Sequence, residues 1–202
     1  MKKPYFIGIA GGSASGKSTF CTILENEFLD LNIKVFHMDD YFKPENERPF
    51  SKSPIKETMY IDDNHPNTIN ISKLKLDLYE ALNDNFNVII LEGLLTLWYE
   101  EIYSKLDLKL FVDCRSDERI VRRLKRNMEW GLTFDDVSNV YLDMVRYRHD
   151  EYVEPTKWKA DLILNGSTIS KVSIDAITNL VRNSIKWKVQ FIINCTFLFY
   201  NF

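Results

Sequence analysis

The sequence contains few cysteines, glycines and prolines. Its 202 residues include 3 cysteines, 7 glycines and 6 prolines, with no internal repeat and no low-complexity tract. The cysteines, Cys21, Cys114 and Cys195, are odd in number and follow no spacing pattern, so they suggest neither a disulfide framework nor a zinc site. This cysteine usage is that expected of a protein in a reducing cytoplasm.

A targeting segment and a membrane span are also missing from the pattern. The start, Met1-Lys2-Lys3-Pro4, leads into an apolar run that Gly11-Gly12 interrupts too soon for a signal peptide. Residues 189–202 are apolar and aromatic but shorter than the ~20 residues that cross a bilayer. For this tail, a packed C-terminal strand, a homo-oligomer contact and a shifted reading frame all stay open. We expect a cytoplasmic protein without a membrane partner.

Basic residues are not in excess. The net charge is −3, and 45% of the residues are hydrophobic and 27% charged, as in an ordinary globular protein. This balance gives no electrostatic reason to expect nucleic acid as a partner, whereas a small anionic ligand needs only a local basic site. A chain of this length usually forms one domain around one core. We place that domain at residues 1–188, followed by the tail 189–202.

A phosphate-binding motif is present near the start of the chain. Residues 11–19 match G-x-x-x-x-G-K-[ST] without a mismatch, and we expect the whole loop to bind a nucleotide: Gly11, Gly12, Ser13, Ala14, Ser15, Gly16, Lys17, Ser18 and Thr19. The glycines let backbone N–H groups turn towards phosphate, Lys17 reaches the outer phosphates, and the Ser18 hydroxyl can ligate Mg²⁺. An apolar strand precedes the loop and an amphipathic helix follows it, which argues against a chance Gly/Ser-rich turn.

Strands and helices are predicted to alternate along the rest of the chain. Apolar runs indicate strands at 5–10, 33–37, 86–91, 108–112 and 161–164. Helical spacing indicates helices from residue 17, from a Ser72 cap, and at 94–102, 116–128, 133–147 and 173–187. This alternation predicts a three-layer α/β fold of the P-loop NTPase class, with a parallel sheet of about five strands and helices on both faces. Residues 43–70 have little periodicity and are predicted to be a loop-rich insertion near the substrate.

Acidic residues follow two of the expected strands. Asp39 and Asp40 come after the strand 33–37, and Glu92 ends the strand that precedes Gly93. The carboxyl ends of parallel strands form the ligand crevice of such sheets. Asp39 could therefore accept a hydroxyl proton, and Glu92 could belong to a Mg²⁺ shell. Taken alone, the Asp pair is better explained as turn chemistry.

Arginines recur along the helix expected at 116–128. They follow at i, i+3, i+4 and i+7, and the opposite side is apolar: Arg119, Arg122, Arg123 and Arg126 against Ile120, Val121, Leu124 and Met128. The helix is therefore expected to pack through its apolar side and to present the arginines outward or into a cleft. A solvated basic face and a phosphate clamp are both open interpretations.

The order of these motifs resembles the uridine kinase / phosphoribulokinase family of P-loop kinases. The matching stretches, over residues 5–166, are GGSASGKST, MDDYFKP, NHPNTIN, IILEGLL, VDCRSDERIVRRLKRN and YVEPTKWKADLILNG. The resemblance implies ATP- and Mg²⁺-dependent phosphorylation of a hydroxyl on a small molecule, most often the 5′-hydroxyl of a nucleoside.

The resemblance also implies roles for individual residues. Lys17 and the loop would hold the ATP phosphates, and Ser18 with Glu92 would serve the metal. Asp39 would be the base, and Arg123 and Arg126 would be lid arginines that contact the acceptor and the phosphates. The acceptor would also meet residues of the Asp63-Asn64-His65 stretch, although a His before Pro is more often a turn or packing residue.

The chain departs from the family pattern at three places. There is no room between Leu82 and Glu92 for the β-hairpin that contacts the pyrimidine. Asn64-His65-Pro66 stands where the family has Asp-His-Pro, so that Asp62 or Asp63 would replace the ribose-binding Asp, or Asn64 would suffice. Trp130-Gly131-Leu132 replaces Arg-Gly-Arg.

Two alternatives to a uridine kinase follow from the residues. Residues 39–44 also look like those of nicotinamide riboside kinases, which gives the nearest competing acceptor. A regulatory P-loop protein that binds nucleotide without transferring phosphate is the alternative from another class. Asp39, Glu92 and the arginine face together favour catalysis, since a switch protein needs elements that respond to the γ-phosphate instead.

Overall fold

The computed structural model describes the backbone of residues 3–199 and the side chains of residues 3–186. A five-stranded sheet lies at its centre, with strand order β2-β5-β1-β6-β7 and every neighbouring pair parallel. The strands are β1 (Tyr5–Gly11), β2 (Ile33–His37), β5 (Val88–Glu92), β6 (Leu108–Asp113) and β7 (Leu162–Asn165). The predicted parallel sheet is therefore confirmed.

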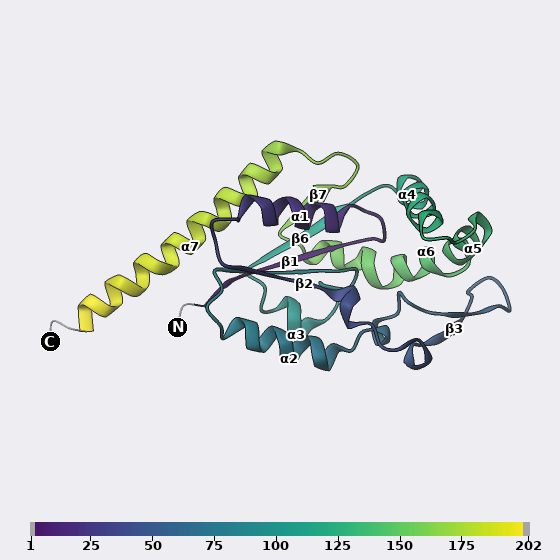
Figure 1. Ribbon diagram of the computed structural model, residues 1–202, viewed down its shortest axis with the longest axis horizontal. Helices are drawn as coiled ribbons and strands as arrows, with labels where there is room; N and C mark the ends of the chain where they lie inside the picture. The colour runs from purple at the N-terminus through teal and green to yellow at the C-terminus, as the bar shows by residue number, and fades with distance from the viewer. Residues whose placement is uncertain (1–2, 200–202) are drawn as a thin grey trace.

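Helices cover both faces of this sheet (Figure 1). α1 (Lys17–Glu27) and α7 (Lys171–Phe199) lie on one face, and α2 (Ile71–Leu82) and α3 (Glu100–Tyr103) lie on the other. Alternate residues of β1 serve the two sides: Tyr5, Ile7 and Ile9 pack towards α1 and α7, and Phe6 and Ala10 towards α2. A strand buried on both faces reads as a continuous apolar run, which explains why β1 was predictable from sequence.

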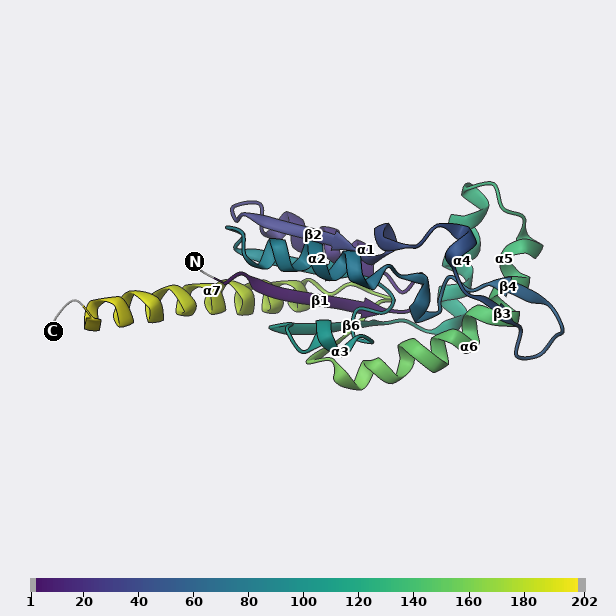
Figure 2. The same cartoon turned by 90° about the horizontal axis from the view of Figure 1, so that it is seen from below.

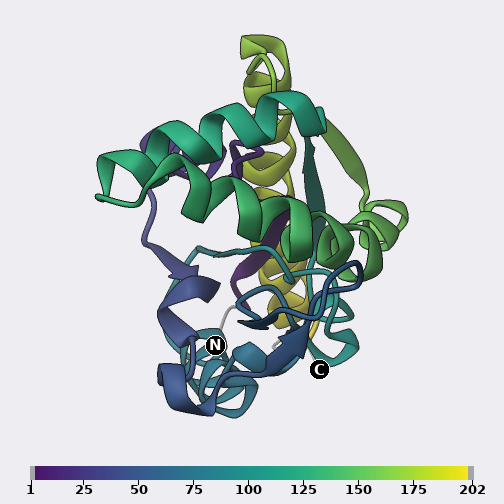
Figure 3. The same cartoon turned by 90° about the vertical axis from the view of Figure 1, so that its right-hand side faces the viewer.

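Beyond the carboxyl ends of the strands lies a third group of elements. α4 (Ser116–Glu129) and α5 (Phe134–Val140) cross this end of the sheet (Figure 3). The chain then continues through π-helical turns at 141–145 and 149–153, which flank α6 (Arg146–Arg148), and through a 3₁₀ segment at 154–159. The helix expected at 133–147 is thus present, with wider π-helical turns at 141–145. Thr133 caps α5 in a reciprocal capping box with Asp136.

The predicted loop-rich insertion, 43–70, contains a β-hairpin. Its strands are β3 (Phe50–Lys52) and β4 (Met59–Ile61), paired antiparallel. Two 3₁₀ turns of the insertion lie at 45–47 and 66–68, and another, at 38–41, precedes it. The hairpin lies at the same end of the molecule as α4 and α5 (Figure 2). As predicted, residues 83–87 leave no hairpin between α2 and β5.

Two local predictions are wrong. Asn70, not Ser72, caps α2, because the Asn70 side chain accepts the Lys73 N–H at 3.1 Å. The helix expected at 94–102 is reduced to α3, and turns occupy residues 94–98. For the tail, three alternatives were open, and the backbone as far as Phe199 is the helix α7, so the packed strand is not formed there. Its side chains beyond residue 186 lie outside the described part. Within the described residues, no helix is long and apolar enough to cross a membrane.

Candidate active site

The phosphate-binding loop joins the end of β1 to the start of α1. α1 begins at Lys17, as predicted, and its cap residue Gly16 has a left-handed φ of 101°. Ala14 also has a positive φ, 62°, and the Ser15 N–H donates to the Gly12 carbonyl at 3.1 Å. A glycine is needed at position 16 because side chains disfavour that conformation. The loop therefore turns tightly into a helix N-terminus, which is a favourable place for an anion.

Gly12 lets two side chains pack onto the loop. A Cβ atom there would collide with the Arg119 guanidinium and would lie 3.0 Å from Cε1 of His149. Arg119 is 6% exposed, and its Nε donates to the Cys114 carbonyl at 3.1 Å. Arg119 thus packs against the loop at Gly12, and it does not belong to the lining of either cavity described next.

Ser18 and Glu92 meet at the carboxyl end of β5. The Ser18 hydroxyl lies 3.3 Å from both carboxylate oxygens of Glu92, and Nδ1 of His37 lies 2.9 Å from Oε1 of Glu92. Glu92 is 5% exposed, so its carboxylate is held between two neighbours in a fixed position. Hydroxyl and carboxylate oxygens are the donors that Mg²⁺ prefers, and protein sites for Mg²⁺ commonly supply only one or two, with phosphates and water completing the shell. The residues fit a Mg²⁺–nucleotide complex.

A cavity of about 490 Å³ opens beside the loop. Its lining combines the loop with two arginines of α4 and with the turn after β7: Ala14, Gly16, Lys17, Ser18, Thr19, Arg122, Arg126, Gly166, Ser167 and Ile169. Arg122 is anchored there because its Nη1 donates to the Gly166 carbonyl at 2.8 Å. We call this the nucleotide cavity, because its size and its cationic side chains suit a polyphosphate ligand.

A second cavity, of about 290 Å³, lies on the other side of Lys17. It is lined by residues from six separate stretches of the chain: Ser13, Lys17, Met38, Asp39, Phe42, Asp63, Asn64, Ile69, Leu94, Leu95, Arg123, Arg126, Asn127, Trp130 and Leu132. Lys17 and Arg126 line both cavities. We call this second one the acceptor cavity. The paired cavities meet where a phosphoryl group could pass from one ligand to the other.

The structure separates the two adjacent aspartates. Asp39 lines the acceptor cavity, whereas Asp40 lines a wide groove between β2 and α2. Asp39 therefore shares a cavity with Lys17 and Arg123. Arg123 donates to the Ser13 hydroxyl at 2.8 Å, and its buried Nε has no partner among the described residues. Burial and the neighbouring Arg126 charge lower the pKa of Arg123, an environment that favours an incoming anion.

The Asp62-Asp63-Asn64-His65 stretch is divided in the same way. Asp63 and Asn64 line the acceptor cavity. Asp62 is fully buried and paired with Arg148, so it is not a substitute ligand for ribose. His65 lies outside the cavity lining: its Nδ1 accepts the Asn67 N–H at 3.0 Å, and its ring packs edge-on against Tyr152. Its place is that of a turn residue.

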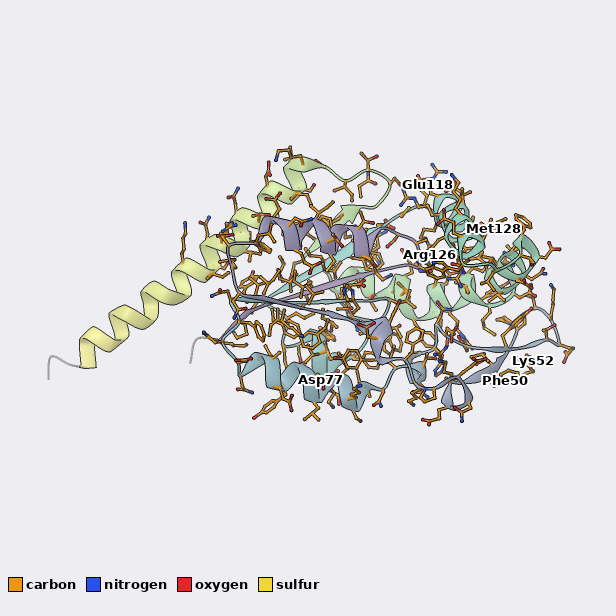
Figure 4. All side chains as sticks on the ribbon, in the orientation of Figure 1. Phe50, Lys52, Asp77, Glu118, Arg126 and Met128 are labelled. Carbon is orange, nitrogen blue, oxygen red and sulfur yellow. The ribbon has the colours of Figure 1, made fainter. Side chains whose placement is uncertain are left out.

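The orientation of α4 corrects half of the predicted inward-packed apolar side: Ile120 and Leu124 are half-buried, but the other two residues are not. Val121 and Met128 are 50% and 48% exposed, while Arg119 and Asn127 are buried. Figure 4 shows Arg126 on the side of α4 towards the strand ends and Met128 further out. The physical reason is that α4 crosses the strand ends, where polar cavities and free carbonyls lie, and does not cover a face of the sheet. The arginines are therefore directed into a cleft, which was one of the two predicted outcomes.

Several residues of the site had no sequence signal of their own. His37, which contacts Glu92, belongs to a strand, and Phe42 and Trp130 in the acceptor cavity read as ordinary apolar residues. Arg126 stacks over Trp130, with 5.0 Å between its guanidinium carbon and the ring centroid. Only the substitution of Trp130 for an arginine in the family pattern could have drawn attention to it.

His149 is the buried histidine of the site. Burial, reinforced by the Arg119 charge, lowers its pKa to about 4. Its Nε2 lies 3.3 Å from a Glu154 carboxylate oxygen, and Nδ1 has no partner among the described residues. Asp113, Asp150 and Lys157 also act on it through their charges. The imidazole is therefore neutral near pH 7 and packs against the loop as an uncharged ring.

The sequence of the chain is similar to those of known proteins. The model of the phosphoribulokinase / uridine kinase family matches residues 64–173. The chain is 33% identical to a uridine kinase from Clostridium botulinum, over 92% of this chain and 100% of that protein. It is 35% identical to a uridine kinase from Geobacillus kaustophilus, over 93% and 98%.

The chain belongs to the phosphoribulokinase / uridine kinase family. It is thus a phosphotransferase that acts on a hydroxyl group of a small molecule. Solved structures support the P-loop kinase fold. One, of a candidate fructose transport system kinase from Silicibacter sp. TM1040, has a TM-score of 0.63 at 16% identity, and the match covers 81% of this chain and 90% of that chain. A structure of a possible uridine kinase from Bacillus stearothermophilus has a TM-score of 0.54 at 18% identity, with coverages of 81% and 89%.

Proposed function

We propose that this chain is an ATP- and Mg²⁺-dependent nucleoside kinase that phosphorylates the 5′-hydroxyl of a riboside, as a uridine kinase does. The observation that carries the proposal is the pair of cavities that meet at Lys17 and Arg126. One is lined by the phosphate-binding loop and the other by two carboxylates, two amides and aromatic rings. Donor and acceptor would therefore bind on opposite sides of the same two cations.

Each side chain has a role that follows from its place. Lys17 and Arg126 would hold the transferring phosphate from both cavities, and Arg123 would neutralise charge that develops on it. Asp39 would accept the proton of the attacking hydroxyl. Ser18 and Glu92 would hold Mg²⁺, which, when bound, neutralises the phosphate charge. Asp63 and Asn64 would orient the ribose hydroxyls.

The acceptor cavity also supports a competing acceptor. The rings of Phe42 and Trp130 offer flat surfaces for a base, and the carboxylates of Asp39 and Asp63 line the same cavity. Aromatic faces and carboxylates suit a cationic ring as well as a neutral one. Nicotinamide riboside is therefore the second candidate, ahead of sugar and vitamin acceptors of the same family.

The location proposed for this reaction is the cytoplasm. Cys21 and Cys114, the cysteines whose side chains are described, are free and buried, which supports a reducing compartment.

The decisive experiment is an ADP-release assay coupled to a chromogenic readout. ATP, Mg²⁺ and the purified chain are incubated with uridine, cytidine, nicotinamide riboside, pantothenate or ribulose 5-phosphate. Acceptor-dependent ADP release with the nucleosides is expected. Nucleotide binding without acceptor-dependent release would favour the regulatory alternative, and release with pantothenate or the sugar phosphate alone would reassign the acceptor.

A further inference from the structure

The turn at 62–65 brings two polar side chains to the acceptor cavity. It follows β4 directly and precedes the 3₁₀ turn at 66–68. Asp63 and Asn64 line the cavity, and Asn64 is only 9% exposed. The position of this turn therefore decides whether an acceptor meets the carboxylate and the amide in a usable geometry.

Asp62 lies at the centre of this turn and is 0% exposed. One of its carboxylate oxygens accepts the Nε–H of Arg148 at 2.6 Å, and the other accepts the backbone N–H of Asn64 at 3.3 Å. Its carbonyl accepts the hydroxyl of Thr68 at 2.6 Å. A single buried residue thus links the cavity-lining turn to a side chain 86 positions further along the chain.

Arg148 is itself held in place. Its side chain is 15% exposed, its Nη1 donates to Glu151, and its guanidinium carbon lies 5.6 Å from the centroid of the Tyr152 ring. The same Tyr152 ring contacts His65 edge-on, with 5.3 Å between the ring centroids. Arg148 precedes the π-helical turn 149–153, an irregularity of the kind that often occurs at functional sites.

The ion pair between Asp62 and Arg148 is better explained by its effect on the geometry of the turn 62–65 than by a gain in folding stability. A buried ion pair gains little net stability, because desolvation of both charges offsets their attraction. Loss of Arg148, in contrast, leaves the buried Asp62 carboxylate without its charged partner, which is strongly destabilising, and we expect the surrounding backbone to move so that water reaches the carboxylate. Here the backbone that would move is the turn that holds Asp63 and Asn64.

We propose that Asp62 and Arg148 are positioning residues for the acceptor. Their ion pair fixes the turn 62–65 so that Asp63 and Asn64 face the acceptor hydroxyls, although neither Asp62 nor Arg148 touches the acceptor. The role in acceptor binding rests on the proposed kinase function. The fixing of the turn is a property of the fold and can be measured without any acceptor.

The first test measures the turn itself by amide hydrogen exchange. Arg148→Met and Asp62→Asn are compared with Arg146→Met, a matched control on the same helical turn, whose guanidinium donates to the Leu142 carbonyl and the Tyr147 hydroxyl. Exchange of the peptide 62–69 is expected to become at least about tenfold faster in the first two variants and to stay unchanged in the control. Unchanged exchange in a folded Arg148→Met protein would overturn the proposal.

The second test separates positioning from a general structural role. For whichever acceptor the wild type phosphorylates, its KM should rise about tenfold or more in Arg148→Met and in Asp62→Asn, while the KM for ATP stays within about twofold. The double variant should raise the acceptor KM no more than the single variants do, because both substitutions remove the same contact. Additive rises of the acceptor KM in the double variant, or an equal rise of the KM values for the acceptor and for ATP, would contradict a positioning role. Arg148→Lys, which keeps the charge, should recover part of the acceptor affinity and replaces Arg148→Met if that variant does not fold.

Failure of the proposed function would be visible separately. If the wild type phosphorylates no acceptor, the kinase assignment is wrong, and the exchange experiment still decides whether the pair holds the turn.

Discussion

Glu92 is the residue at which two elements of the site are joined through one carboxylate. It accepts hydrogen bonds from Ser18, the residue after the P-loop lysine, and contacts His37 at the end of the edge strand β2. A carboxylate held in this way, at 5% exposure, has its oxygens in fixed positions.

Glu92→Gln is expected to weaken the dependence on Mg²⁺ far more than stability. The amide keeps the shape of the side chain but removes the negative charge that attracts the cation, so the Mg²⁺ concentration for half-maximal activity should rise at least about tenfold. Thermal unfolding should change little. Glu100→Gln, an exposed acid in the first turn of α3, is the control. A Mg²⁺ titration identical to that of the wild type would remove Glu92 from the metal shell.

Lys17→Ala is expected to abolish phosphoryl transfer and to leave the fold intact. Lys17 lines both cavities, and the loss of one donor to a transferring group typically lowers kcat by 10²–10³-fold, so a fall of ~100-fold or more is predicted. Lys125→Ala, an exposed change on α4, should keep wild-type turnover. The measurements are kcat and the melting temperature. Normal turnover in Lys17→Ala would end the interpretation of this loop as a catalytic P-loop.

At the scale of elements, the parallel strands were predictable and α4 was only partly so. β2 matches its predicted bounds because an apolar run ends in a polar stretch at His37. The orientation of α4 could not be derived from its amphipathic pattern, since that rule assumes that the core lies beneath the helix. Here the strand ends lie beneath it, and Arg119 and Arg122 donate to the carbonyls of Cys114 and Gly166 that follow β6 and β7.

The hairpin β3–β4 was missed for a different reason. Strands of three residues with one exposed side leave too short an alternation to detect. Its stability comes from a distant partner: Asp143, in the π-helical turn, accepts from Lys56 and Tyr60, each at 2.8 Å. Contacts between residues so far apart in the chain have no sequence signature, and the same holds for Asp62 and Arg148.

The packing of His149 against the loop predicts a stability that falls in mild acid. The pKa of His149 is about 4 in the folded chain and near 6.5 when unfolded, so between these values only the unfolded imidazole binds a proton. Stability is therefore complete above pH 6.5 and decreases as the pH falls, by about 1 kcal/mol between pH 6.5 and 5.5. Urea unfolding of the wild type and of His149→Gln checks this. The variant should lose this part of the slope, and equal slopes would show that His149 is not buried as a neutral ring.

At the scale of the whole molecule, the site is assembled from segments that the sheet brings to one end. The loop after β1, the Asp39 turn after β2 and Glu92 at the end of β5 were predicted to meet because parallel strands share a carboxyl edge. The turn 62–65 and Trp130 reach the acceptor cavity from outside the sheet. The lack of periodicity over 43–70 placed the turn only roughly, near the substrate, the family resemblance pointed to its individual residues, and nothing assigned a role to Trp130.

The acceptor cavity as a whole predicts weak discrimination between bases. Residues 83–87 hold no hairpin, and none of the β3 and β4 residues lines the cavity. Away from the loop and the arginines, the polar side chains in the lining are Asp39, Asp63, Asn64 and Asn127, with the flat rings of Phe42 and Trp130 beside them. A site rejects an analogue strongly only if it leaves buried polar partners unpaired. Stacking surfaces accept most planar rings.

Uridine and cytidine are therefore expected to differ by less than about tenfold in kcat/KM, or ~1.4 kcal/mol. Asp39→Asn should slow every accepted riboside by a similar factor, typically 10²–10⁴, because a general base serves the hydroxyl whichever base is attached. Asp40→Asn is the matched control, since Asp40 faces the groove beside α2 and should leave turnover unchanged. Competition of the two nucleosides for limiting ATP measures the ratio directly. A strong preference for uridine would show that the insertion 43–70 closes on the base when the acceptor binds, and a loss confined to one riboside in Asp39→Asn would assign Asp39 to recognition rather than proton transfer.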